Sequence, residues 1–167
     1  MELKILVFSD SHRSLSFMRS CVDTIKPDAI IHLGDHYADG ENIHQEYPDI
    51  LFYQVPGNCD LYSCPPFARE QLIQRLGGVD FYLTHGHIHK VKQTLYALLR
   101  DARACGCAAA LYGHTHIPDC HQEEDGLWVL NPGAAKYDRG TAGLIEVNDR
   151  KITGCRVISG RDLEEIV

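Results

Sequence analysis

The feature that most constrains the fold is a series of short apolar segments, each of which ends abruptly at a polar loop. The first of these segments span residues 4–8 (KILVF), 29–33 (AIIHL) and 50–55 (ILFYQV). Runs that are short, apolar at successive positions and rich in β-branched residues are typical of strands buried on both faces. Between the first two runs, apolar residues recur at helical spacing from Leu15 to Ile25, with Ser14 as the expected N-cap. This order of strand, helix and strand predicts an α/β sheet.

The second half of the chain predicts further strands and adds antiparallel pairing. Residues 71–76 and 79–84 flank Gly77-Gly78, and a two-residue glycine turn between such runs indicates a hairpin. Apolar residues at helical spacing predict a helix over residues 95–105. Further short strands are expected at residues 108–112, 127–130, 142–147 and 151–158. No internal repeat or linker interrupts residues 1–167, so we expect one domain.

Composition limits the kind of partner that the protein can have. The 167 residues carry a formal charge of −7 and no basic run, which argues against duplex nucleic acid and anionic membranes. An anionic substrate would need local positive charge, which bound metal ions would supply. The seven cysteines are scattered, with no Cys-x-x-Cys pair, so we expect reduced thiols. The apolar run near the N-terminus is too short for a signal peptide or a membrane span, and we expect a cytoplasmic protein.

Polar side chains gather where the predicted strands stop. Such residues are Asp10, His12, Asp35, Asn58, Asp60, His85, His87, His114 and His116. Because sites in open α/β sheets form at the carboxyl ends of the strands, these residues are expected to meet although they lie far apart in sequence. Carboxylates, an amide oxygen and imidazoles suit borderline divalent ions such as Mn, Fe, Zn or Ni. The sequence therefore predicts a site for two metal ions that share one carboxylate.

These motifs, taken in order, resemble the signature of the calcineurin-like metallophosphoesterases. The motifs are SDSH at residues 9–12, GD at 34–35, GNCD at 57–60, THGH at 84–87 and GHTH at 113–116. The resemblance covers residues 4–147 and is strongest to the small one-domain phosphodiesterases of bacteria and archaea. It implies an α/β fold, a two-layer β-sandwich of mixed sheets flanked by helices. It also implies two divalent metal ions, with manganese expected first and zinc, iron or nickel as alternatives.

The resemblance also implies which residues bind which ion. One ion would be held by Asp10, His12, Asp35 and His116, and the other by Asn58, His85 and His114 together with the bridging Asp35. The spacing in Gly-His-Thr-His then has a meaning, because alternate side chains at one strand end reach different ions. A metal-bridging hydroxide would attack the phosphorus of a phosphodiester in line, while the ions offset the charge of the phosphate oxygens.

Cys59 departs from the wider family pattern. Many members have histidine after the asparagine of this motif, where it is held to protonate the leaving oxygen. A thiol brings no positive charge, so we expect a preference for singly charged diesters over doubly charged monoesters. Cys59 as a covalent nucleophile is an alternative that a metal hydroxide makes unnecessary. The predicted catalytic set is completed by Asn58 and His87, which would contact the substrate, and by Asp60, which would orient a neighbouring ligand.

A few residues carry separate expectations. His36 lies beside the predicted site or is a plain surface histidine, whereas His89 and His121 are expected to be solvated. Cys105 and Cys107 are expected to pack at a helix end, with binding of a soft metal as the alternative.

Two other functions remain open at this point. A retromer trafficking subunit of the same fold serves as a protein-interaction scaffold, and phosphomonoesterases share these motifs. The intact ligand positions favour an enzyme over a scaffold, and Cys59 favours diesters over monoesters. We therefore expect a small phosphodiester substrate bound in an open cleft of broad specificity. Exposed apolar strand edges leave room for a homo-oligomer.

Overall fold

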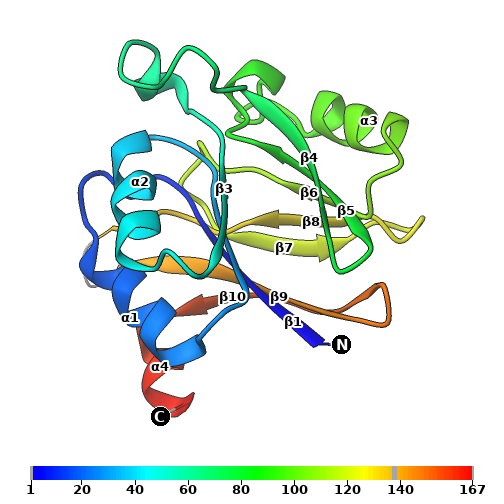
Figure 1. Cartoon of the computed structure of the whole chain (residues 1–167). Coiled ribbons are helices and arrows are strands. Elements are labelled where there is room, and N and C mark those ends of the chain that lie inside the picture. The colour runs from blue at the N-terminus through cyan, green and yellow to red at the C-terminus, as the bar shows by residue number, and fades with distance from the viewer. Residues whose placement is uncertain (1, 137–138, 167) are drawn as a thin grey trace.

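Two five-stranded sheets pack face to face, and helices cover their outer faces (Figure 1). This computed structural model describes residues 2–136 and 139–166 of the chain. The predicted sandwich of two mixed sheets flanked by helices is confirmed. Among the helices of the described residues, none combines the length and the apolar character needed to cross a bilayer.

The first sheet has the strand order β10-β9-β1-β2-β3. Its strands are β1 (Glu2–Phe8), β2 (Ala29–His32), β3 (Leu51–Gln54), β9 (Thr141–Asn148) and β10 (Lys151–Ser159). Strands β1, β2 and β3 are parallel, whereas β9 pairs antiparallel with both β1 and β10. The helices on its outer face are α1 (Ser16–Ile25), α2 (Tyr37–Glu46) and α4 (Gly160–Ile166).

The second sheet has the strand order β4-β5-β6-β8-β7. Its strands are β4 (Gln71–Leu76), β5 (Val79–Thr84), β6 (Ala109–Leu111), β7 (Asp119–Gln122) and β8 (Trp128–Asn131). Strands β5, β6 and β8 are parallel, and β4 and β7 pair antiparallel at the two edges. Helix α3 (Tyr96–Ala104) covers the outer face. Gly77 and Gly78 have φ values of 61° and 81°, which a two-residue hairpin turn of type I′ requires.

Alternation along the strands divides the core between the sheets and the helices. On β1, Ile5 and Val7 face the second sheet, whereas Leu6 and Phe8 pack against α1 and its neighbours. All four side chains are fully buried. Successive residues of a strand point to opposite faces, so a strand covered on both faces must be apolar at every position. This is the reason for the uninterrupted apolar run at residues 5–8.

The structure differs from the sequence predictions in elements that lack an apolar pattern. Helices α2 and α4 and strand β7 were not predicted, and β7 reads DCHQ with no apolar run. Helix α1 begins at Ser16, with Leu15 rather than Ser14 at its N-cap position. At the end of α3, Cys107 is buried as expected, but Cys105 is exposed.

His89 was expected to be solvated, and this expectation is wrong. Its side chain is buried, and Nε2 lies 3.1 Å from Asp101 Oδ2 and 3.2 Å from the Tyr82 hydroxyl oxygen. The local sequence around His89 is polar, but its two partners come from α3 and β5. His121, by contrast, is partly exposed between Asp119 and Glu123.

Candidate metal centre

The predicted ligands come from loops that follow parallel strands of both sheets. Asp10 follows β1, Asp35 follows β2, Asn58 follows β3, His85 follows β5 and His114 follows β6. The carboxyl ends of these strands lie at the same edge of the sandwich, so the loops converge there. The structure brings all the predicted metal ligands to this one edge.

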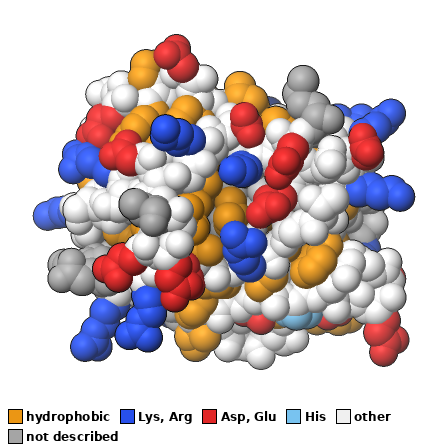
Figure 2. Space-filling view, turned by 90° about the horizontal axis from the view of Figure 1, so that it is seen from below, with side chains coloured by type: hydrophobic (Ala, Val, Ile, Leu, Met, Phe, Trp, Pro, Cys, Tyr) orange, Lys and Arg blue, Asp and Glu red, His pale blue; other side chains and the backbone are white. Residues whose placement is uncertain are grey.

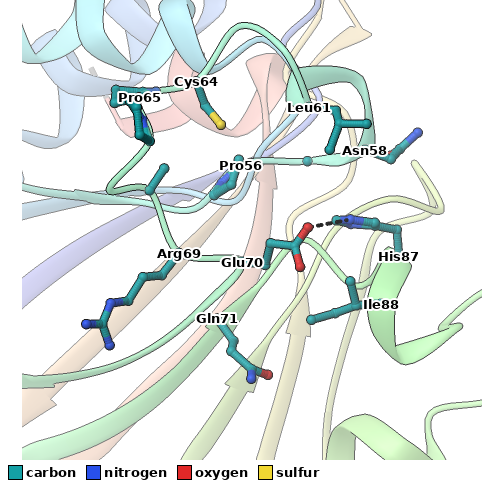
Figure 3. Close-up of a pocket in the computed structure, with 13 residues that line it drawn as sticks. Pro56, Asn58, Leu61, Cys64, Pro65, Arg69, Glu70, Gln71, His87 and Ile88 are labelled. Atoms are coloured by element: carbon teal, nitrogen blue, oxygen red, sulfur yellow. Dashed lines mark ion pairs between the residues drawn. The ribbon is translucent and has the colours of Figure 1, made fainter.

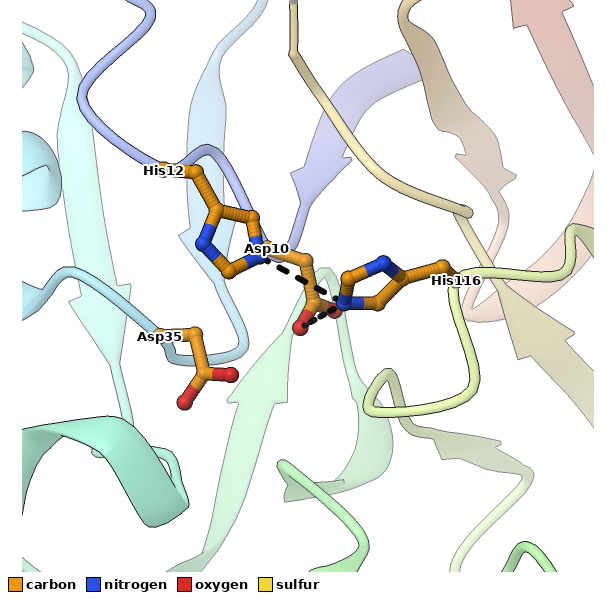
Figure 4. Close-up of side chains that lie close together, drawn as sticks. All are labelled: Asp10, His12, Asp35 and His116. Carbon is orange, nitrogen blue, oxygen red and sulfur yellow. Dashed lines mark hydrogen bonds and ion pairs between the residues drawn. The ribbon is translucent and has the colours of Figure 1, made fainter.

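The first predicted ligand set forms a compact cluster. Asp10, His12, Asp35 and His116 each offer one ligand atom, and these four atoms lie within 4.8 Å of one another. Nε2 of His116 is 3.1 Å from Asp10 Oδ1 and 3.4 Å from Nε2 of His12. Figure 4 shows the two imidazoles and the two carboxylates directed toward a common point. Asp10 and Asp35 are buried, whereas His116 is exposed, so one side of the cluster is open to solvent.

The second predicted ligand set lies beside the first and meets it at Asp35. Nε2 of His85 is 3.1 Å from Asn58 Oδ1 and 3.5 Å from Asp35 Oδ2. The rings of His85 and His114 are 5.1 Å apart between centroids. Asp35 therefore stands between the two sets, in the place of the predicted bridging ligand.

One buried oxygen shows that these residues fit a cation. Oδ2 of Asp10 accepts hydrogen bonds from the Ser9 hydroxyl at 2.6 Å and from the backbone N–H of His114 at 3.1 Å. Oδ1 of the same carboxylate is buried and has no hydrogen-bond partner among the described residues. The contact of Oδ1 with His116 lacks hydrogen-bond geometry. A buried oxygen left without a partner is costly, and a bound metal ion would satisfy it.

The orientation of His85 also suits a metal. Its Nδ1 lies 2.8 Å from the backbone carbonyl oxygen of Leu33, which can only accept, so in the neutral ring Nδ1 carries the proton. The lone pair of Nε2 then faces the oxygens of Asn58 and Asp35. Several lone pairs directed at one another repel unless a cation lies among them. Such a carbonyl contact behind an imidazole is common at metal sites.

Electrostatics keep the imidazoles in the form that binds metals. Burial lowers the pKa of His12, with Asp10 opposing the shift and His116 adding to it. Burial, followed by the neighbouring His85, lowers the pKa of His114. For Asp35, burial pushes the pKa up, but His85 and the backbone N–H of Cys59 outweigh it and the net pKa is lowered. These shifts favour neutral imidazoles at His12 and His114 and an ionised carboxylate at Asp35 at neutral pH.

Backbone strain is concentrated at this site. Of the eleven non-glycine residues with positive φ among those described, six lie here: Asp10, His12, Asp35, His36, His114 and His116. The left-handed conformation costs a non-glycine residue about 1–2 kcal/mol. Such strain persists only where the surrounding structure holds it, and it gathers at functional sites. The loops are therefore held in place in advance of any ligand.

Asp60 lies behind the ligands rather than among them. Its carboxylate is buried and accepts backbone N–H groups of Asp35 at 2.9 Å, Gly57 at 2.8 Å and Tyr37 at 2.9 Å. These contacts join the loop after β2 to the loop after β3. The geometry is that of a residue which orients its neighbours.

Cys59, His87 and His36 border the cluster. The backbone N–H of Cys59 donates to Asp35 Oδ1 at 2.9 Å, and burial together with Asp35 raises the pKa of its thiol. The His87 ring lies 5.5 Å from that of His85, and its Nε2 is 3.5 Å from Glu70. The His36 ring lies 5.0 Å from that of His12.

A buried network that was not predicted from the sequence supports the loop of Asp10 and His12. Ser11 Oγ donates to Asp39 Oδ2 at 2.7 Å and lies 2.9 Å from His32 Nε2. The backbone N–H of Gly34 donates to His32 Nδ1 at 3.2 Å, so the ring proton is on Nε2. Burial lowers the pKa of His32 to about 4. The one signal in the sequence was a histidine inside an apolar strand.

A cavity beside the candidate metal ligands also left no sign in the sequence. It has a volume of about 850 Å³ and is walled by residues 56–58, 61, 64–66, 68–71 and 87–88 (Figure 3). From the sequence, an open cleft with little to define specificity was expected. Most of the wall residues lie between residues 56 and 70, a largely irregular stretch that carried no pattern to predict them, and Gln71 of β4 and residues 87–88 complete the wall.

Comparisons with known proteins agree with this geometry. Residues 3–150 match the family model of the calcineurin-like phosphoesterase superfamily domain. A probable metallophosphoesterase of Mycoplasma pneumoniae is 31% identical over 144 residues, which cover 84% of each chain. A Streptococcus pneumoniae structure described as a predicted phosphoesterase has a TM-score of 0.74 and 26% identity, covering 97% of this chain and 91% of that one.

The fold is shared with proteins named otherwise. Vacuolar Protein Sorting 29 from Cryptosporidium parvum has a TM-score of 0.69 at 18% identity, covering 95% of this chain and 98% of that one. This likeness concerns the fold alone. With its matching residues, its two-sheet fold and its converging carboxylates and imidazoles, this chain belongs to the calcineurin-like phosphoesterase superfamily.

Proposed function

We propose that the protein is a phosphodiesterase that works with two divalent metal ions. The observation that carries this proposal is the convergence of two ligand sets on Asp35, with the buried Oδ1 of Asp10 left for a cation. One ion would be held by Asp10, His12, Asp35 and His116, and the other by Asp35, Asn58, His85 and His114. Such ions stabilise charge on phosphate oxygens and lower the pKa of coordinated water.

The protein's own residues would position the substrate around that centre. Asn58 lies at the border between the ligands and the cavity, where its amide can contact a phosphate oxygen as well as metal. His87 borders the cavity on the same side and would contact the phosphate or an ester oxygen. Asp60 would act through Asp35 and keep it in place.

The preference for diesters rests on Cys59. Its position next to Asn58 and Asp35 carries a neutral thiol, which cannot offset the second charge of a monoester as a charged imidazole would. A diester has only one negative charge, so it depends less on such a cation. We propose manganese as the working metal, with zinc, iron or nickel as alternatives, because the donors are imidazole nitrogens and oxygens.

The proposed partner is a small phosphodiester rather than duplex nucleic acid or a membrane. On the face drawn in Figure 2, basic and acidic side chains are interspersed rather than gathered by sign. A net charge of −7 would repel a polyanion over long distances. We also propose a cytoplasmic location.

The test is hydrolysis of an activated aryl phosphodiester by metal-stripped protein with Mn, Zn, Ni or Mg restored one at a time. The matching monoester is measured beside it. Asp35→Asn should abolish turnover, because it removes the negative charge of the carboxylate that both ions would share. Asparagine tolerates the left-handed backbone at this position, so the variant should still fold. Asp149→Asn is the matched control, since Asp149 is exposed and has φ 50° against 59° for Asp35.

A protein-interaction scaffold is the second candidate, favoured by the fold that the chain shares with Vacuolar Protein Sorting 29. Binding of two ions with no turnover of either ester would support the scaffold and reject the phosphodiesterase. Faster turnover of the monoester would instead reject the diester preference.

A further inference from the structure

We infer that the cavity beside the candidate metal centre binds one ester group of the substrate, and that this group is uncharged and apolar. The inference rests on the proposed phosphodiester hydrolysis and adds the kind of diester. The cavity volume of about 850 Å³ lies in the range of small-molecule sites. The cavity has room for an ester group that contains a ring, together with one edge of the bound phosphate group.

The cavity is continuous with the metal ligands. Asn58 and His87 line it, and Asn58 Oδ1 is 3.1 Å from Nε2 of the predicted ligand His85. A phosphate bound at the predicted metal ligands would therefore lie at the cavity's inner end. One of its two ester groups would then extend along the cavity wall.

The wall includes large apolar side chains that an ester group can cover. Leu61 and Ile88 line the cavity, and their side chains are 65% and 41% exposed. Figure 3 shows them on either side of His87 and Glu70. Large apolar side chains exposed beside a polar site mark a binding surface, since covering them removes apolar area from water. Pro56, Pro65 and Pro66 add rigid rings, so little conformational entropy is lost on binding.

The charges of the wall disfavour a second anionic group. Arg69 and Glu70 line the cavity and their formal charges cancel. Glu70 is the one that faces the inner end, with Oε1 3.5 Å from His87 Nε2, whereas Arg69 points outward in Figure 3. A second phosphate would meet this carboxylate. An uncharged group would not, and the cavity therefore selects a diester with an apolar substituent over a polyphosphate chain.

Two monoanionic analogues that lack a cleavable aryl ester test the inference by binding alone. Methyl phenylphosphonate and methyl methylphosphonate carry the same charge and differ only in the ring. Calorimetric titration of manganese-loaded protein should show about tenfold tighter binding of the phenyl compound, as expected when a ring is buried. The double variant Leu61→Ser, Ile88→Ser should bind the two compounds within about twofold of each other.

Matched control variants distinguish the effect of changing the cavity wall from the effect of removing exposed apolar side chains elsewhere on the protein. Leu51→Ser and Ile166→Ser change side chains that are 52% and 48% exposed and lie outside the cavity, so they should keep the phenyl preference. Equal binding of both phosphonates by the wild type, or an unchanged preference in the double variant, would overturn the inference. Failure to bind either compound would overturn it as well.

The same titration keeps this inference distinct from the proposed function. A phenyl preference without hydrolysis of the activated diester would reject the phosphodiesterase and leave the cavity as a binding site for aryl anions. Diester hydrolysis without a phenyl preference would retain the enzyme and reject the cavity as its ester subsite.

Discussion

The backbone N–H of Asp35 donates a 2.9 Å hydrogen bond to Oδ2 of Asp60, so one aspartate fixes the backbone of the other. The same Oδ2 accepts the N–H of Gly57, the residue before Asn58. A buried carboxylate outside the ligand sets thus holds two predicted ligands through their loops.

Asp60→Asn should weaken both the fold and metal binding. The asparagine side chain has one accepting oxygen, and its NH₂ group would face a backbone N–H to which it cannot bond. A loss of about 2 kcal/mol in the free energy of unfolding is therefore expected. Metal affinity should fall at least about tenfold, as for other residues that support ligands. Urea unfolding and metal titration measure the two effects, with Asp149→Asn as control. Unchanged metal affinity in the folded variant would show that Asp60 does not position Asp35.

His32 should make stability depend on pH between about 6.5 and 4. Burial lowers its pKa from 6.5 in the unfolded chain to about 4, so below pH 6.5 the unfolded state binds a proton that the folded state does not. Stability is therefore complete above pH 6.5 and falls as the pH drops toward 4. The loss by pH 4.5 is about 2–3 kcal/mol.

His32→Gln removes this titration while keeping a polar side chain beside Ser11. Urea unfolding at pH 7 and pH 4.5 should therefore show a smaller acid loss for the variant than for the wild type, by about 2–3 kcal/mol. Equal acid losses for the two proteins would mean that His32 is not the group responsible.

Cys59→His should move the specificity toward monoesters. An imidazole beside Asn58 and Asp35 can carry the positive charge that the thiol lacks. A charged hydrogen bond to the second anionic oxygen predicts a rise of about tenfold or more in monoesterase relative to diesterase kcat/KM. Cys59→Ser, which is also neutral, should leave the ratio near that of the wild type. If both variants shift the ratio alike, charge at this position is not the cause.

Gly113→Ala should disturb Asp10 directly. A Cβ at Gly113 would lie 2.9 Å from Asp10 Oδ2, and it would also contact the Ser9 hydroxyl. We expect a loss of about 1–3 kcal/mol in unfolding free energy together with weaker metal binding. Gly154→Ala is the control, because a Cβ there meets its neighbours at 3.6 Å. Metal affinity equal to that of the wild type would show that the Asp10 carboxylate does not depend on this close approach.

The sequence predicted that the candidate ligands would converge, because they sit at the ends of buried strands. Asp10 and Asp35 each follow an apolar run, and parallel strands bring such ends together whatever their separation in sequence. The network of Ser11, His32 and Asp39 could not be predicted, because Asp39 belongs to α2, a helix with little apolar pattern.

The cavity wall was beyond sequence reasoning for a similar reason. Leu61 and Ile88 stand on separate segments, and neither segment has the periodicity of a long helix or a strand. Their place in one cavity depends on how the loop after η1 (Asn58–Asp60) lies relative to η2 (His87–His89). No local sequence pattern predicts which irregular segments will lie together in the fold.

Each ligand set takes residues from both sheets. Asp10, His12 and Asp35 follow strands of the first sheet, whereas His116 follows a strand of the second, and His85 and His114 face Asn58 across the same boundary. A bound ion would thus fasten the two layers of the sandwich at one end. Separation of the layers would then also require breaking the metal–ligand bonds, so a metal-loaded preparation should unfold more slowly than a metal-free one.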